Sequence, residues 1–71
     1  MNTYHITSNG GTDFGEWTAT TKAAALYQLH QNAGCGNFVN YDEANDKLLF
    51  LDDETKDNLG DVEDWVIEEI S

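Results

Sequence analysis

Alternating polar and apolar positions at the start of the chain predict a β-hairpin. Residues 3–8 are rich in β-forming side chains and place Tyr4 and Ile6 on one face. Residues 8–13 are dense in turn formers and include Asn-Gly, a strong hairpin signal. Residues 14–20 alternate again, as expected for the returning strand.

A helix is predicted over residues 22–33, because the segment consists largely of strong helix formers. Thr21 suits the N-cap, and Gly34 is placed where a C′ residue would end the helix. One apolar stripe at helical spacing consists of Ala25, Leu26, Leu29 and Ala33. We expect this stripe to cover one face of a sheet.

The middle of the chain predicts two more strands, at residues 37–41 and 47–51, joined by a polar turn at 42–46. The run from Leu48 to Leu51 is the most apolar in the chain, which favours a central strand. Residues 52–60 are strongly acidic, and we expect a loop there.

The last segment, residues 61–70, fits two descriptions. Apolar side chains at 62, 65, 66 and 70 suit a helix, whereas Trp65-Val66-Ile67 has high β propensity. We favour a closing strand. The elements together predict one α+β domain over residues 1–71: a small antiparallel sheet, made of the N-terminal hairpin and two or three further strands, with one helix packed on one face.

Charge is distributed unevenly along the chain. The net charge is −11, and the residues after Tyr41 carry twelve acids against only Lys47 and Lys56. A field of this kind repels nucleic acid and attracts basic surfaces. Carboxylates two apart on a strand lie ~6.6–6.8 Å apart, close to the ~7 Å between alternate phosphates of one DNA strand. The acidic half is therefore suited to imitate a phosphate row.

We predict that the acids after Tyr41 bind a basic partner, and that the protein does not bind nucleic acid directly. The predicted partner-binding residues are Asp42, Glu43, Asp46, Asp52, Asp53, Glu54, Asp57, Asp61, Glu63, Asp64, Glu68 and Glu69. A surface that serves only solubility is the alternative, but such surfaces usually mix both signs and have a net charge of ~2–8.

The sequence contains few residues suited to catalysis, and we predict a protein that is not an enzyme. Cys35 with His5 or His30 is the only conceivable nucleophilic pair, and no oxyanion-hole signal accompanies it. We predict no cofactor, because phosphate-binding and dinucleotide motifs are absent. We predict no metal site, because the histidines and Cys35 lack zinc-ligand spacing and the acidic stretches lack the EF-hand pattern.

A single cysteine permits no intrachain disulfide, which fits a reducing cytoplasm. No apolar run has the ~20 residues of a membrane span, and the N-terminus lacks the features of a signal peptide. We expect a cytoplasmic protein of a bacterial host cell that does not engage membranes. A thin core leaves a homodimer conceivable, although a monomer is the expected state.

The N-terminal half resembles the opening of many small bacterial and phage proteins. The resemblance rests on Tyr4-His5-Ile6-Thr7-Ser8, the turn through Gly11, Asp13-Phe14-Gly15 and the Ala/Leu helix that ends at Ala33-Gly34. With its small size and acidity, the whole chain resembles phage-encoded anti-CRISPR proteins, directed at a type I surveillance complex and possibly type I-C. The resemblance implies an acidic DNA mimic that blocks the PAM-reading site. The alternative is a small regulatory module that captures another basic nucleic-acid-binding protein.

Overall fold

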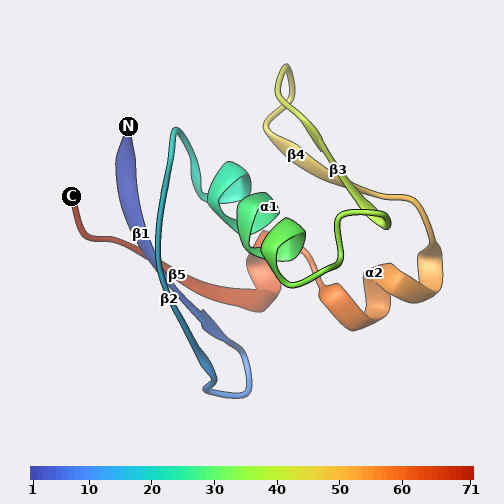
Figure 1. Cartoon of the computed structure of the whole chain (residues 1–71), viewed down its shortest axis with the longest axis horizontal. Helices are drawn as coiled ribbons and strands as arrows, with labels where there is room; N and C mark the ends of the chain where they lie inside the picture. The colour runs from blue at the N-terminus through green and yellow to red at the C-terminus, as the bar shows by residue number, and fades with distance from the viewer.

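Two antiparallel sheets pack on opposite sides of one helix (Figure 1). The computed structural model describes all residues, 1–71. The first sheet has the strand order β2-β1-β5, and the second consists of β3 and β4. The elements in chain order are β1 (Asn2–Ser8), β2 (Asp13–Ala19), α1 (Lys22–Asn32), β3 (Val39–Asp42), β4 (Lys47–Phe50), α2 (Asp53–Leu59), the short 3₁₀ helix η1 (Val62–Asp64) and β5 (Trp65–Glu69). The predicted α+β class is confirmed.

The N-terminal hairpin and the closing strand are both confirmed. β1 pairs antiparallel with β2 and with β5, so β1 is the central strand of the first sheet. Ile6 faces Ile67 across β1 and β5, and Tyr4 faces Trp17 across β1 and β2. These side chains line the face that α1 covers. The last strand therefore closes the fold by returning to the first.

Helix α1 forms as predicted and supplies much of the core. The Thr21 hydroxyl accepts a hydrogen bond from the Ala24 amide at 3.1 Å, which caps the N-terminus. Gly34 follows the helix with φ +86°, a conformation that glycine adopts without strain. The buried apolar core consists of Tyr4, Ile6, Ala19, Ala25, Leu26, Leu29, Val39, Leu48 and Ile67.

The prediction that the run from Leu48 to Leu51 forms a central strand is wrong. β4 pairs with β3 alone, as one half of a separate hairpin. Leu48 is buried against the core, whereas Leu49 is 45% exposed and Leu51 is 66% exposed. The run is apolar because both faces of this hairpin carry large side chains, and only one of those faces is covered.

The prediction of a loop over residues 52–60 is also wrong, because residues Asp53–Leu59 form α2. The Asp52 side chain accepts a hydrogen bond from the Glu54 amide at 2.9 Å and caps this helix. Asp53 and Glu54 in the first turn and Lys56 in the last turn complement the helix dipole. Gly60 ends the helix with φ +71° and ψ 163°.

Candidate docking surface

The twelve predicted partner-binding acids lie in three separate groups. Asp42, Glu43 and Asp46 lie at the turn between β3 and β4, while Glu68 and Glu69 lie on β5. The remaining seven occupy α2 and η1 and the residues beside them. Figure 1 shows the tip of the β3–β4 turn at the top, the end of β5 at the left, α2 at the right and η1 near the centre. The acids at the tip of the turn, at the end of β5 and on α2 therefore do not form one continuous patch.

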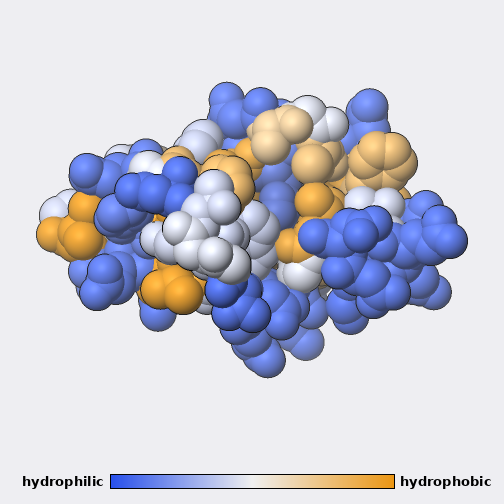
Figure 2. All heavy atoms as spheres, turned by 90° about the horizontal axis from the view of Figure 1, so that it is seen from below, coloured by the Kyte–Doolittle hydropathy of each residue, from blue (hydrophilic) through white to orange (hydrophobic).

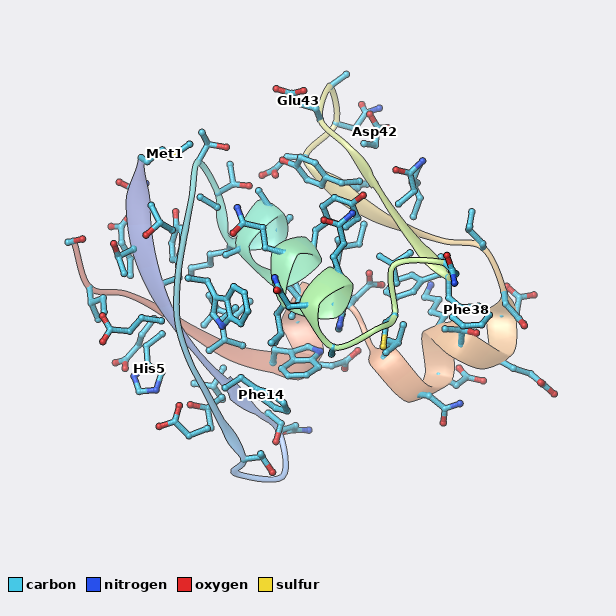
Figure 3. All side chains as sticks on the ribbon, in the orientation of Figure 1. Met1, His5, Phe14, Phe38, Asp42 and Glu43 are labelled. Atoms are coloured by element: carbon cyan, nitrogen blue, oxygen red, sulfur yellow. The ribbon has the colours of Figure 1, made fainter.

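The β3–β4 turn uses its acids largely for internal hydrogen bonds. Oδ1 of Asp46 accepts from the Tyr41 hydroxyl at 2.7 Å and from the Thr21 hydroxyl at 2.6 Å. Oδ2 of Asp42 accepts from the Asn45 side-chain amide at 2.6 Å, and this bond lowers the pKa of Asp42. Glu43 projects from the tip of the turn (Figure 3). Only Glu43 in this group lacks an internal partner.

One of the two acids of β5 lies beside a histidine. Glu68 pairs with His5 across the sheet, on the face opposite α1. Nε2 of His5 lies 2.7 Å from Oδ1 of Asp13, and this hydrogen bond raises the pKa of His5. Glu16 and Glu68 raise it further. When His5 is protonated, its positive charge offsets part of the negative field on this face.

The third group is the densest, and we name it the α2–η1 surface. It consists of Asp52, Asp53, Glu54, Asp57, Asp61, Glu63 and Asp64. Three of these acids hold the segment together. Asp52 caps α2, Oδ2 of Asp64 accepts from the Asp61 amide at 2.9 Å, and Oδ2 of Asp61 lies 3.7 Å from Nζ of Lys56.

Four carboxylates of the α2–η1 surface have no such structural bond: Asp53, Glu54, Asp57 and Glu63. All four are exposed, and none has a cation within ion-pair distance. Asp53 and Asp57 are four apart on α2, which places their Cβ atoms ~5–6 Å from each other. This separation approaches the ~7 Å between alternate phosphates, although a helix rather than a strand sets it.

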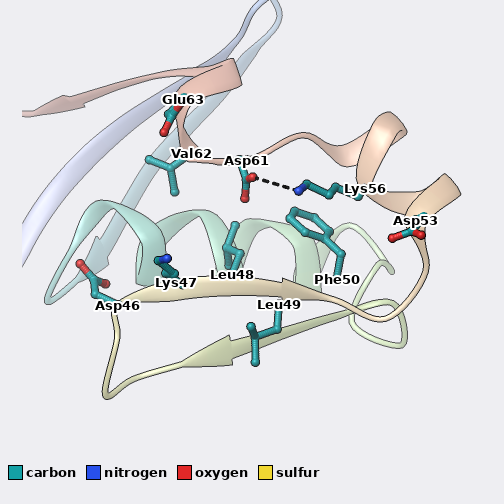
Figure 4. Close-up of a pocket in the computed structure, with 10 residues that line it drawn as sticks. All are labelled: Asp46, Lys47, Leu48, Leu49, Phe50, Asp53, Lys56, Asp61, Val62 and Glu63. Carbon is teal, nitrogen blue, oxygen red and sulfur yellow. Dashed lines mark ion pairs between the residues drawn. The ribbon is translucent and has the colours of Figure 1, made fainter.

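Figure 2 shows the surface around α2, where hydrophobic atoms lie directly beside a broad hydrophilic area. A groove with a volume of about 620 Å³ runs between β4 and the α2–η1 segment. Its lining residues are Asp46, Lys47, Leu48, Leu49, Phe50, Asp53, Lys56, Asp61, Val62 and Glu63 (Figure 4). The sequence prediction missed this groove because it did not predict α2, which forms one wall.

Leu48, Phe50 and Val62 point into the space between β4 and the α2–η1 segment, whereas Leu49 lies on the other side of β4 (Figure 4). Leu48 is buried, and Phe50 and Val62 are half-buried. The groove therefore has an apolar floor beside two of the four exposed carboxylates, Asp53 and Glu63. An apolar run in β4 and an isolated Val62 between acids were the only signals of it in the sequence.

No side-chain hydrogen bond joins the two histidines and Cys35 to one another. His30 is 2% exposed, and its Nε2 has no hydrogen-bond partner. Cys35 is a half-buried free thiol, and no hydrogen bond joins its side chain to either imidazole. No three His, Cys, Asp or Glu side chains come together in an arrangement that could hold a metal ion. None of the helices is both long and apolar enough to cross a membrane.

Comparison of the chain with known protein families, curated proteins and solved structures finds no match.

Proposed function

We propose that this protein is a binding module that occupies the nucleic-acid-binding surface of a basic protein. The α2–η1 surface would take the place of the phosphate backbone. Such a module acts by exclusion, without catalysis or a cofactor, in the cytoplasm of a bacterial host. The single observation that carries the proposal is the group of four exposed, unpaired carboxylates at Asp53, Glu54, Asp57 and Glu63.

The scarcity of internal cations supports this proposal. The chain has fourteen acids, and only Asp13 and Asp61 lie within ion-pair distance of a basic side chain. Arg is absent, so the protein has no guanidinium to pair with its own carboxylates. The exposed acids are left free to pair with Lys and Arg of a partner, and their field would steer that partner to the surface.

The specific target that we propose is the site of a type I CRISPR surveillance complex that reads the PAM duplex, with type I-C as the first to test. The resemblance to phage-encoded anti-CRISPR proteins suggests this target. The shared chemistry is a Lys- and Arg-lined groove that normally holds a DNA backbone.

The test is displacement of a labelled PAM-containing duplex from the purified type I-C complex, measured by gel mobility shift. We expect the protein to release the duplex at about one molecule per binding site and to lose potency as NaCl rises. We also expect no shift of the duplex by the protein alone. A duplex that stays bound at a large molar excess of the protein would contradict this target.

A further inference from the structure

The groove between β4 and the α2–η1 segment has the shape of a receptor for a side chain. Its volume of about 620 Å³ lies within the ~300–1,000 Å³ typical of ligand pockets. Leu48, Phe50 and Val62 supply apolar surface inside it (Figure 4). These residues come from β4 and η1, which are separated along the chain by α2. An apolar side chain placed there would contact apolar surface of both β4 and η1.

The rim of the same groove is mainly anionic. Asp53 and Glu63 are exposed carboxylates without ion pairs, and they come from α2 and η1 respectively. Four acids and two lysines line the groove; Nζ of Lys56 lies 3.7 Å from Oδ2 of Asp61, and Lys47 has no ion pair. Cationic groups that flank an apolar side chain would therefore find free partners on two of the elements that form the groove.

We propose that this groove holds an apolar side chain of the basic partner, flanked by Lys or Arg residues that pair with the rim carboxylates. This inference rests on the proposed function and adds to it a contact that nucleic acid itself could not make. Long-range charge would bring the partner to the α2–η1 surface, and the apolar side chain would then set the lifetime of the complex.

Charge favours a basic partner over a second copy of this chain. Each copy has a net charge of −11, and a symmetric contact would bring the exposed carboxylates of two rims together. The repulsion acts at short range, where salt screens it poorly. A basic segment with one Leu-sized side chain can place that side chain on the apolar floor and pair its cationic groups with the carboxylates of the rim.

Two synthetic peptides test this inference: a short peptide with two Arg on each side of a central Leu, and its match with Ser in place of Leu. Binding to the full chain is measured by amide chemical shifts in ¹H–¹⁵N NMR spectra. We expect the Leu peptide to bind about tenfold more tightly, because it buries an apolar side chain. We also expect its largest shifts at Leu48, Phe50 and Val62.

Equal affinities for the two peptides, with chemical-shift changes confined to the outer side of α2, would contradict the proposal that the groove binds an apolar side chain. The same result would be compatible with the proposed function. Failure of both peptides to bind would also contradict the proposal that the groove binds an apolar side chain. The proposed function would still be tested independently by displacement of the duplex. Self-association through these residues in sedimentation experiments would contradict the choice of partner.

A pair of charge variants gives a second measurement. Lys56→Gln removes one of the two lysines that line the groove, and Lys22→Gln makes the same change in net charge at the start of α1, outside the groove. We expect Lys56→Gln to bind the Leu peptide about threefold more tightly than Lys22→Gln does. The reason is that Lys56→Gln removes Coulomb repulsion between Lys56 and the Arg residues of the peptide. Equal affinities of the two variants would contradict a cationic occupant.

Discussion

The imidazole of His30 packs edge-on against the indole of Trp65, with ring centroids 5.5 Å apart and an angle of 71° between the rings. This contact joins α1 to the start of β5 and therefore ties the last strand to the core. The imidazole is 2% exposed, and its Nε2 has no hydrogen-bond partner. A basic group in this position stabilises the fold only while it stays neutral.

Stability should therefore fall as the pH drops below the ordinary histidine pKa of 6.5. Burial lowers the pKa of His30 in the folded state, so the unfolded state takes up a proton first. His30→Phe keeps the edge-on ring and removes the unpartnered nitrogen. We expect this variant to be about 1 kcal/mol more stable at pH 7 and less sensitive to acidification. Urea unfolding at pH 7 and pH 5.5 checks both effects, and an unchanged pH dependence in the variant would contradict them.

The two histidines should titrate on opposite sides of the ordinary pKa. The hydrogen bond that His5 donates to Asp13 raises the pKa of His5, and burial lowers the pKa of His30. An NMR titration of the imidazole Cε1–H resonances measures both values. Asp13→Asn should return the pKa of His5 toward 6.5 and leave His30 unchanged. A shift of both resonances in the variant would show that the two sites are not independent.

For His5 the stability effect has the opposite sign. Its folded-state pKa is raised, so its contribution is fully present below pH 6.5 and is lost as the pH rises through the folded value. The pair with Asp13 is exposed, so solvent screens this contribution. We expect His30 to dominate the change in stability between pH 7 and pH 5.5.

Added salt should raise the melting temperature. With a net charge of −11 and two ion pairs, one of which requires a protonated His5, repulsion among carboxylates outweighs attraction. Thermal unfolding in ~50 mM and ~500 mM NaCl measures the effect. Neutralisation of Asp53, Glu54 and Asp57 should reduce the salt dependence. A melting temperature that falls with added NaCl would contradict this prediction.

Gly60 should resist substitution because it joins α2 to η1 in a conformation that side chains oppose. Its φ of +71° and ψ of 163° lie in a region that almost only glycine adopts. A Cβ at this position would lie 2.9 Å from Cβ of Asp64. We expect Gly60→Ala to lower the free energy of unfolding by about 1–3 kcal/mol.

Gly10→Ala is the matched control for Gly60→Ala. Gly10 has no positive φ, and a Cβ there would meet nothing closer than the Ser8 hydroxyl at 3.9 Å. Denaturant unfolding of both variants makes the comparison. Equal losses of stability would mean that the junction between α2 and η1 is not constrained as described.

The elements that the sequence predicted correctly are those with strong local signals. Asn-Gly and the alternating strands predict the first hairpin, and Thr21 and Gly34 bound α1. The segment from Trp65 forms a strand because it adds to the open edge of β1, where tertiary pairing supports its β propensity.

The missed features depend on signals that are weak or not local. Helix α2 has little apolar periodicity, although Asp52 as a cap and Gly60 as a stop both mark it. The separation of the two sheets depends on pairing between distant strands, which a local pattern does not specify. The distribution of charge along the sequence led to the prediction that all twelve acids after Tyr41 bind the partner. In the fold, the path of β5 carries Glu68 and Glu69 away from α2.

In the proposed function, the position of the acids on α2, and not their number, creates the docking surface. Two triple variants separate these properties. Asp53→Asn with Glu54→Gln and Asp57→Asn neutralises α2, while Glu43→Gln with Glu68→Gln and Glu69→Gln neutralises three acids outside the α2–η1 surface. Each variant removes three of the negative charges that give the net −11. Neither variant changes the cap Asp52 or the bonded Asp61 and Asp64.

The most direct measurement is the concentration of wild type and of each triple variant that displaces half of a PAM-containing duplex from the type I-C complex. We expect the half-displacing concentration of the α2 variant to be at least about tenfold higher than that of the wild type, as a loss of about 1.4 kcal/mol in binding free energy implies. We expect the other variant to stay close to the wild type. Equal losses in the two variants would mean that net charge alone is recognised, and would contradict a docking surface on α2.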